Sequence, residues 1–169
     1  MLRRLARFRV TLGFVFGVLA LWLAAPSPRS LAIGAAIAIA GEFIRIWAAG
    51  HLEKGREVTS SGPYAITRHP LYLGSTVMGI GLAVAASSLV VASMVAVYLA
   101  ATLTAAIRTE EAHLTEKFGS AYPEYRNGRV ETVARRFSFP RAMRNREYRA
   151  AIGLLVAFAV LAWKVFGRH

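Results

Sequence analysis

The chain has 169 residues, of which 56% are hydrophobic, and its formal net charge is +12. Long apolar blocks are typical of a polytopic membrane protein and argue against a soluble globule. The sequence has no cysteine, which excludes disulfides, thiolate metal sites and a cysteine nucleophile. The basic residues alternate between loops, so we attribute the charge to membrane topology rather than to nucleic-acid binding.

The first apolar block covers residues 10–25 and follows four arginines within the first nine residues. A basic start and a short apolar run also describe a signal peptide. We favour a membrane span because Pro26, directly after Ala25, is a poor context for cleavage and because further apolar blocks follow.

The second predicted span covers residues 31–50 and contains Glu42 and Arg45, three residues apart and therefore on one helix face. Ionisable groups inside a span usually face a partner or a wet cavity. The alternative is a mutual ion pair near the interface, with the arginine extended toward water. The sequence leaves both open.

Residues 70–107 contain no charged side chain, and these 38 residues are enough for two crossings. A turn at Ser87-Ser88 divides them into predicted spans over 70–86 and 89–107. Pro70 suits the first turn of a helix, where its missing N–H costs nothing. We expect the fourth helix to continue past the uncharged stretch and to end at Gly119.

Residues 129–149 hold seven arginines with aromatic residues between them, which predicts contact with anionic lipid headgroups. A fifth apolar run covers 150–166. Seventeen of the 21 Lys and Arg fall on one side of this arrangement, which predicts a cytoplasmic N-terminus and an external C-terminus. The predicted fold is an all-α bundle of about five transmembrane helices, forming a single domain over 1–169.

Polar residues gather at both ends of the uncharged stretch, on its predicted cytoplasmic side. His69 and Tyr72 stand at one end, and Glu110 and Glu111 at the other. Carboxylates, a histidine and tyrosine rings suit a small cationic molecule such as S-adenosylmethionine, without requiring it. The four histidines have no zinc spacing, so we predict no metal site.

Several motifs around this site follow one another in a specific order. They are Gly62-Pro63-Tyr64, Arg68-His69-Pro70-Leu71-Tyr72-Leu73-Gly74, Glu110-Glu111-Ala112-His113-Leu114, and Phe118-Gly119 with Tyr122 and Tyr125. This order resembles the isoprenylcysteine carboxyl methyltransferase family and the related phosphatidylethanolamine N-methyltransferases, over about residues 41–130.

The resemblance implies a methyltransferase that holds S-adenosylmethionine at the cytoplasmic face and receives a lipophilic acceptor from the bilayer. The cofactor contacts that it implies are Val58, Thr59, Tyr64, His69, Pro70, Tyr72, Gly79, Gly81, Glu110 and Glu111. Eukaryotic members place an arginine for the substrate carboxylate where this chain has Ala106, and Arg108 lies two residues further on. Arg108, Glu42 and Arg45 are the candidate catalytic residues, with Glu42 or a tyrosine as the base for an amine acceptor.

We therefore expect carboxyl O-methylation of a prenylated or lipid-like acceptor, with phospholipid N-methylation as the alternative. Two other classes remain: a nicotinamide-dependent enzyme similar to sterol reductases, and a membrane protein without catalytic activity. The Ala- and Arg-rich, Lys-poor composition favours a bacterial source and hence the bacterial cytoplasmic membrane.

Overall fold

A computed structural model describes residues 2–129 and 135–167, with side chains from Gly13 onward. In chain order the elements are α1 (Leu2–Leu23), α2 (Pro28–His51), the short 3-10 helix η1 (Gly62–Ala65), α3 (Pro70–Ala86), α4 (Leu89–Phe118), α5 (Ala121–Arg126), α6 (Phe139–Arg144) and α7 (Tyr148–Phe166). No strand occurs among the described residues, and the predicted all-α class is confirmed. The four arginines of the N-terminal stretch lie outside the residues whose side chains are described.

The five predicted apolar segments correspond to five apolar helices of unequal length. Three of them, α2, α4 and α7, are long and apolar enough to cross a membrane. Gly13–Leu23 of α1 and the whole of α3 are shorter apolar helices. These helices indicate a multi-pass membrane protein, with three crossings supported by helix length and composition.

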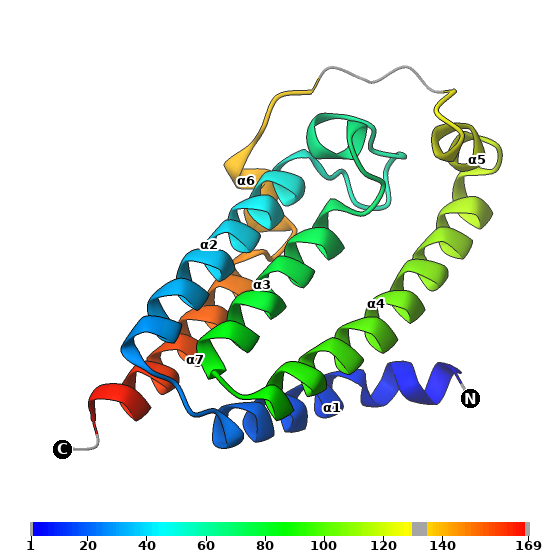
Figure 1. The fold of residues 1–169 in the computed structure, drawn as a ribbon. Coiled ribbons are helices and arrows are strands. Elements are labelled where there is room, and N and C mark those ends of the chain that lie inside the picture. The colour runs from blue at the N-terminus through cyan, green and yellow to red at the C-terminus, as the bar shows by residue number, and fades with distance from the viewer. Residues whose placement is uncertain (1, 130–134, 168–169) are drawn as a thin grey trace.

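Helices α2, α3 and α7 pack side by side, while α4 leans away from α3 beyond the turn that joins them (Figure 1). The tightest pair is α2 with α3, where glycines face each other. A Cβ at Gly81 would lie 2.6 Å from the carbonyl oxygen of Gly34, and a Cβ at Gly41 would lie 2.8 Å from that of Gly74. Small residues therefore let the two backbones approach closely, as is common between membrane helices.

Helix α2 begins at Pro28, three residues before the predicted start of the second span. Ser27 and Ser30 form a capping box: each side chain accepts a hydrogen bond from the other residue's backbone N–H, at 3.1 Å and 2.9 Å. Pro28 at the first helical position needs no hydrogen-bond acceptor. The polar cap thus extends the helix beyond its apolar stretch.

The predicted boundaries of α3, Pro70–Ala86, are confirmed. Ser87 adopts a left-handed conformation with φ of 48°, and the hydroxyl of Ser88 caps α4. Helix α4 continues past the uncharged stretch and ends at Gly119, whose φ is +56°, as predicted.

Three short helical elements that the sequence did not predict, η1, α5 and α6, lie at the end of the bundle away from the α3–α4 turn (Figure 1). Residues near α6 satisfy the last carbonyl groups of α2. Arg141 donates to the carbonyl of Gly50 at 2.6 Å, and the amide of Asn145 donates to that of Ala49 at 2.8 Å. Helix ends need such partners, and here they come from a distant part of the chain that no local pattern identifies.

Candidate functional site

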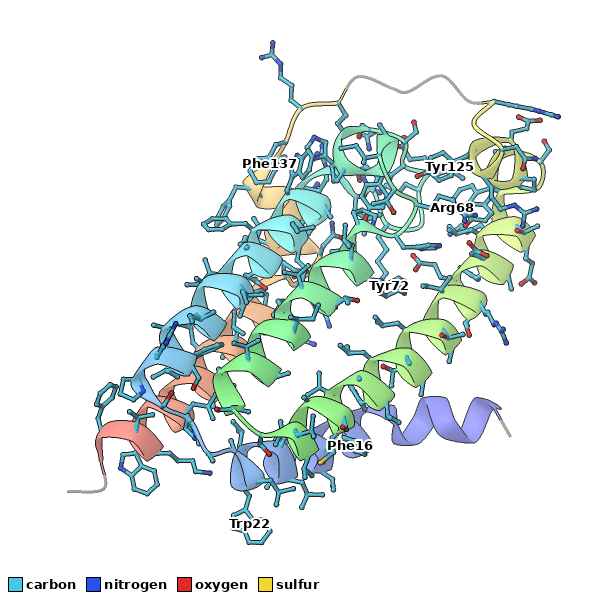
Figure 2. The ribbon with its side chains drawn as sticks, in the orientation of Figure 1. Phe16, Trp22, Arg68, Tyr72, Tyr125 and Phe137 are labelled. Carbon is cyan, nitrogen blue, oxygen red and sulfur yellow. The ribbon has the colours of Figure 1, made fainter. Side chains whose placement is uncertain are left out.

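A polar cluster centred on Glu111 lies at the same end of the bundle as α5 and α6. The side chain of His69, which directly precedes α3, places Nε2 3.1 Å from Glu111 Oε1. The hydroxyl of Tyr122, on α5, donates to the same oxygen at 3.0 Å. Arg68 Nη1 lies 3.5 Å from it, and Arg68 and Tyr72 point toward this region (Figure 2). One carboxylate therefore joins three separate segments.

Two tyrosines connect η1 to α5 beside this cluster. The hydroxyl of Tyr125 donates to the backbone carbonyl of Tyr64 at 2.6 Å. Burial raises the pKa of the Tyr64 phenol, and the charge of Glu110 raises it further. The pKa of Tyr122 is also raised, first by burial and then by the hydrogen bond to Glu111. Both phenols therefore stay protonated at neutral pH, and that of Tyr122 donates to Glu111.

The two adjacent glutamates of α4 differ in their partners. Glu111 is held by the contacts above, whereas Glu110 makes no hydrogen bond or ion pair with the described residues. Glu110 is half-buried, and its charge acts on the phenol of Tyr64. Its carboxylate is thus available to a ligand, while that of Glu111 is already occupied.

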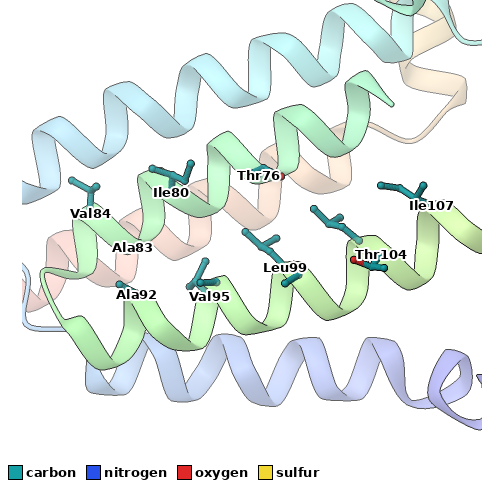
Figure 3. Close-up of a pocket in the computed structure, with 12 residues that line it drawn as sticks. Thr76, Ile80, Ala83, Val84, Ala92, Val95, Leu99, Thr104 and Ile107 are labelled. Atoms are coloured by element: carbon teal, nitrogen blue, oxygen red, sulfur yellow. The ribbon is translucent and has the colours of Figure 1, made fainter. Parts of the chain in front are cut away.

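An apolar groove of about 610 Å³ runs between α3 and α4 (Figure 3). Its walls are mostly aliphatic, with Thr76 on α3 and Thr104 on α4 as the polar contributions. Thr76 is four residues after Tyr72, and the lining residue Ile107 is four residues before Glu111. Because four residues make about one helical turn, the groove ends one turn from the polar cluster.

A second charged cluster surrounds Arg45 on α2. Its Nε lies 2.6 Å from Glu147 Oε1, next to the start of α7, and 3.9 Å from Glu42 Oε2. Arg45 also donates to the hydroxyl of Ser75 and, at 3.4 Å, to the carbonyl of Leu71. Glu42 is only 7% exposed, and neither carboxylate oxygen has a hydrogen-bond partner among the described residues.

Helix α3 separates the Arg45 cluster from the groove. Ser75 contacts Arg45 on the α2 side, while Thr76 lines the groove on the α4 side. The predicted residues Glu42 and Arg45 therefore lie together, away from the groove. The third candidate, Arg108, is exposed on α4, four residues after Thr104 of the groove wall. The structure brings His69 and Glu111 together and does not bring Glu42 to them.

The predicted loop residues Val58 and Thr59 lie in the segment between α2 and η1. Thr59 is buried, and its hydroxyl accepts a hydrogen bond from the backbone N–H of Glu53 at 3.1 Å. Val58 is half-buried. The neighbouring Ser61 has a buried hydroxyl without a hydrogen-bond partner among the described residues.

The remaining predicted residues are in α3. Pro70 is buried in its first turn. A Cβ at Gly79 would lie 2.5 Å from Leu99 of α4, and one at Gly81 would lie 2.6 Å from the backbone of Gly34. Both glycines thus allow close helix packing, on the two opposite sides of α3.

Glu147 was not singled out from the sequence. It stands three residues before the last apolar run, in a segment dominated by arginine. An isolated acid at such a boundary is a signal for a buried partner, but only the tertiary structure identifies Arg45 as that partner.

Residues 8–121 match the sequence model of a family described as phospholipid methyltransferase. The match spans more than half of the chain and includes His69, Glu110 and Glu111. The chain belongs to the phospholipid methyltransferase family. This confirms the sequence-based prediction of membership in the group of membrane methyltransferases. Helices α6 and α7, and Glu147 between them, lie beyond residues 8–121, the part of this chain that matches the family.

Two curated relatives are named for metal resistance. The cobalt-zinc-cadmium resistance protein CzcN of Cupriavidus metallidurans is 35% identical over 95 residues, which cover 55% of this chain and 41% of that protein. The nickel-cobalt-cadmium resistance protein NccN of Alcaligenes xylosoxydans xylosoxydans is 31% identical over 99 residues, covering 57% and 45%. The chain thus matches less than half the length of these relatives. No group of three or more metal-ligating side chains occurs among the described residues.

No solved structure matches this chain.

Proposed function

We propose that the chain is an integral-membrane methyltransferase that uses S-adenosylmethionine to methylate a lipid-like acceptor. One observation carries the proposal: the groove between α3 and α4 ends one helical turn from the Glu111 cluster. An apolar groove suits an acyl or prenyl chain, and a polar cluster at its end suits a charged cofactor and the acceptor's reacting group. Membership of the phospholipid methyltransferase family supports the same reaction class.

The side chains around Glu111 fit S-adenosylmethionine chemically. We assign the ammonium of the cofactor to Glu110, because this carboxylate has no partner among the described residues. The hydroxyl of Ser61 and the ring of Tyr72 provide further polar and aromatic contacts for it. Glu111 instead holds His69 and Tyr122 in position. When bound, the cofactor supplies an electrophilic methyl group on a sulfonium.

Carboxyl O-methylation is the first candidate for the reaction. A carboxylate is already deprotonated at neutral pH and requires no base, so the protein contributes positioning and the exclusion of water. Arg108 lies one turn beyond the groove wall at Thr104 and carries a guanidinium suited to pairing with a carboxylate. We propose that Arg108 takes this role in place of an arginine at Ala106.

Phospholipid N-methylation is the second candidate, favoured by the description of the family. A protonated amine must lose a proton before it can accept a methyl group. Glu42, the base expected from the sequence, lies across α3 from the groove, beside Arg45. We therefore do not propose Glu42 as the base for an amine acceptor.

We further propose that the end of the bundle carrying η1, α5 and α6 faces the cytoplasm, as the distribution of Lys and Arg predicts. The cofactor then enters from the cytoplasm and the acceptor enters from the bilayer through the groove between α3 and α4. The cysteine accessibility of exposed positions in α5, tested in inverted and right-side-out vesicles, measures this orientation.

Cofactor binding is tested by calorimetric titration of the detergent-purified protein with S-adenosylmethionine. Glu110→Gln is expected to weaken binding by roughly 10- to 100-fold, the value of one charge-assisted hydrogen bond, without lowering the unfolding temperature. Glu116→Gln, an exposed glutamate on the same helix, is the matched control and should bind normally. Equal affinity of the Glu110 variant and the wild type for S-adenosylmethionine would contradict the assignment of the ammonium to Glu110. Saturable binding of a reduced nicotinamide instead would favour the reductase class.

The acceptor class is tested with radiolabelled S-adenosylmethionine and two acceptors, an S-prenylated cysteine with a free carboxylate and phosphatidylethanolamine. A methyl ester is released as methanol by mild base, whereas an N-methyl group is stable. Base-labile product from the first acceptor, lost in Arg108→Gln, would support O-methylation. Base-stable product from the second, unaffected by Arg108→Gln, would support N-methylation.

A further inference from the structure

The arginines of residues 135–149 fall into two groups with different surroundings. Arg141 Nε lies 2.7 Å from Glu53 Oε1, and Arg135 Nη1 lies 2.6 Å from Glu57 Oε1. These two ion pairs fasten the segment to the loop that follows α2. The second group is exposed and makes no ion pair with the described residues; it comprises Arg136, Arg144, Arg146 and Arg149.

Exposed aromatic side chains lie between the arginines of the second group. Phe137 is 46% exposed, Phe139 57% and Tyr148 42%. We name this set the basic aromatic patch; its members are Arg136, Phe137, Phe139, Arg144, Arg146, Tyr148 and Arg149. Glu147, the acid in the same stretch, is buried against Arg45 and does not reach this surface.

The patch lies where two membrane-length helices end. Tyr148 is the first residue of α7, and Phe137 packs against His51 at the end of α2, with 6.1 Å between the ring centroids (Figure 2). Both α2 and α7 are long and apolar enough to cross a membrane. Their ends therefore mark the level of the lipid headgroups, where aromatic rings and long cationic side chains gather.

We propose that the basic aromatic patch binds the anionic headgroups of phospholipids in the adjacent leaflet. Guanidinium groups form paired hydrogen bonds to phosphate oxygens, and the patch presents four of them, with no exposed carboxylate among its own residues, all of which the structure describes. The aromatic rings suit the boundary between headgroups and acyl chains. The two internal ion pairs of Arg135 and Arg141 hold the segment in place, so that the other arginines remain available to lipid.

Arg146 provides a variant that separates binding from folding. It adopts a left-handed backbone with φ of 61° in the turn between α6 and α7, where its N–H donates to the carbonyl of Met143 at 2.9 Å. Residues with a side chain are disfavoured in this conformation, whereas glycine adopts it freely. Arg146→Gly therefore removes a charge without straining the turn.

The test measures the quenching of Trp47, which lies one turn before the end of α2 at the level of the patch. Trp22 and Trp163 are replaced by Phe, so that Trp47 is the reporter. The full chain is reconstituted in phosphatidylcholine with increasing fractions of either brominated phosphatidylglycerol or brominated phosphatidylcholine. We expect phosphatidylglycerol to quench at a several-fold lower fraction. Each patch arginine removed should reduce this preference by up to about fivefold, which corresponds to about 1 kcal/mol.

Three variants make the test specific. Arg144→Gln combined with Arg149→Gln should lose most of the preference, and Arg146→Gly should lose part of it with an unchanged or higher unfolding temperature. Arg29→Gln is the matched control, an exposed arginine at the opposite end of α2, and should keep the preference.

Equal quenching by the two lipids in the wild type would overturn the proposal, as would a full preference in the Arg144 and Arg149 double variant. If Arg29→Gln loses the preference for phosphatidylglycerol to the same extent, the preference depends only on the net charge of the protein, and the proposal is also overturned. If inorganic phosphate abolishes the preference and chloride of equal ionic strength does not, the patch recognises free phosphate rather than a lipid surface, and the proposal also fails.

Discussion

Replacing Glu147 by glutamine tests whether the helix beyond the matched family region stabilises the core of the bundle. Glu147 is 5% exposed, and its carboxylate lies 2.6 Å from Arg45 Nε. Arg45 in turn contacts Ser75 and the carbonyl of Leu71 in the first turns of α3. The pair therefore ties α7 to the start of the helix that follows His69.

Removing one partner of a buried ion pair costs about 3–5 kcal/mol, because the other charge stays buried and uncompensated. Two features of this site reduce that cost. Glutamine keeps an oxygen that accepts from Arg45, and Glu42 lies 3.9 Å away as a second carboxylate. We therefore expect Glu147→Gln to lose about 2–3 kcal/mol, which for a protein of this size lowers the unfolding temperature by about 5–10 °C.

The assay is thermal unfolding of the purified protein in detergent, followed by circular dichroism. Glu124→Gln, an exposed carboxylate on α5, is the matched control. Glu42→Gln should leave stability unchanged or raise it, because that carboxylate has no hydrogen-bond partner among the described residues. The double variant of Glu42 and Glu147 should lose more than the sum of the single changes, since Arg45 then has neither carboxylate. The reasoning fails if Glu147→Gln unfolds at the wild-type temperature, or if Glu42→Gln is the more damaging change.

Three further predictions, tested with four variants, concern other contacts. Gly81→Ala should destabilise the α2–α3 pair by several kcal/mol, because its Cβ would meet backbone atoms. The Cβ of Gly153→Ala would enter open space, so this variant should be more stable by up to about 1 kcal/mol through helix propensity. Both are measured in the same unfolding assay. The hydrogen bond from Arg141 lowers the pKa of Glu53, so this pair stabilises the fold fully above the usual glutamate pKa and progressively less as pH falls through the lowered value. Unfolding midpoints measured at decreasing pH should therefore fall more steeply in the wild type than in Arg141→Gln; parallel curves would refute the pair's contribution. Lys164→Met removes the hydrogen-bond donor to the carbonyl groups at the end of α1 and should lower the free energy of unfolding by about 1–3 kcal/mol. The α1–α2 linker should then be cleaved faster by a protease. A cleavage rate equal to that of the wild type would contradict this prediction.

Local sequence chemistry predicted most of the helices of this protein. Pro70 and the Ser87-Ser88 turn correctly bounded α3, and Gly119 correctly ended α4. The apolar pattern predicts a start of α2 at residue 31, three residues late, because this pattern does not include the capping residue Ser27. The short elements η1, α5 and α6 were not predicted, since elements of four to six residues carry too few positions for a hydrophobic period.

For the candidate site, the sequence by itself determined the inventory and its arrangement at the two ends of an uncharged stretch. Two predicted crossings joined by a turn were sufficient to place Glu110 and Glu111 at the same end as His69. Only the tertiary structure showed which partner each acidic residue has. Glu111 is held by His69 and Tyr122, and Glu110 remains without a partner among the described residues. Glu42 lies across α3 from the groove, beside Arg45. The physical reason is that a sequence period specifies the face of a helix on which a side chain lies. Which neighbour covers that face depends on helix packing. Here the packing is set by the glycines that bring α2 and α3 together and by the contact of Glu147 with Arg45, about a hundred residues away in the sequence.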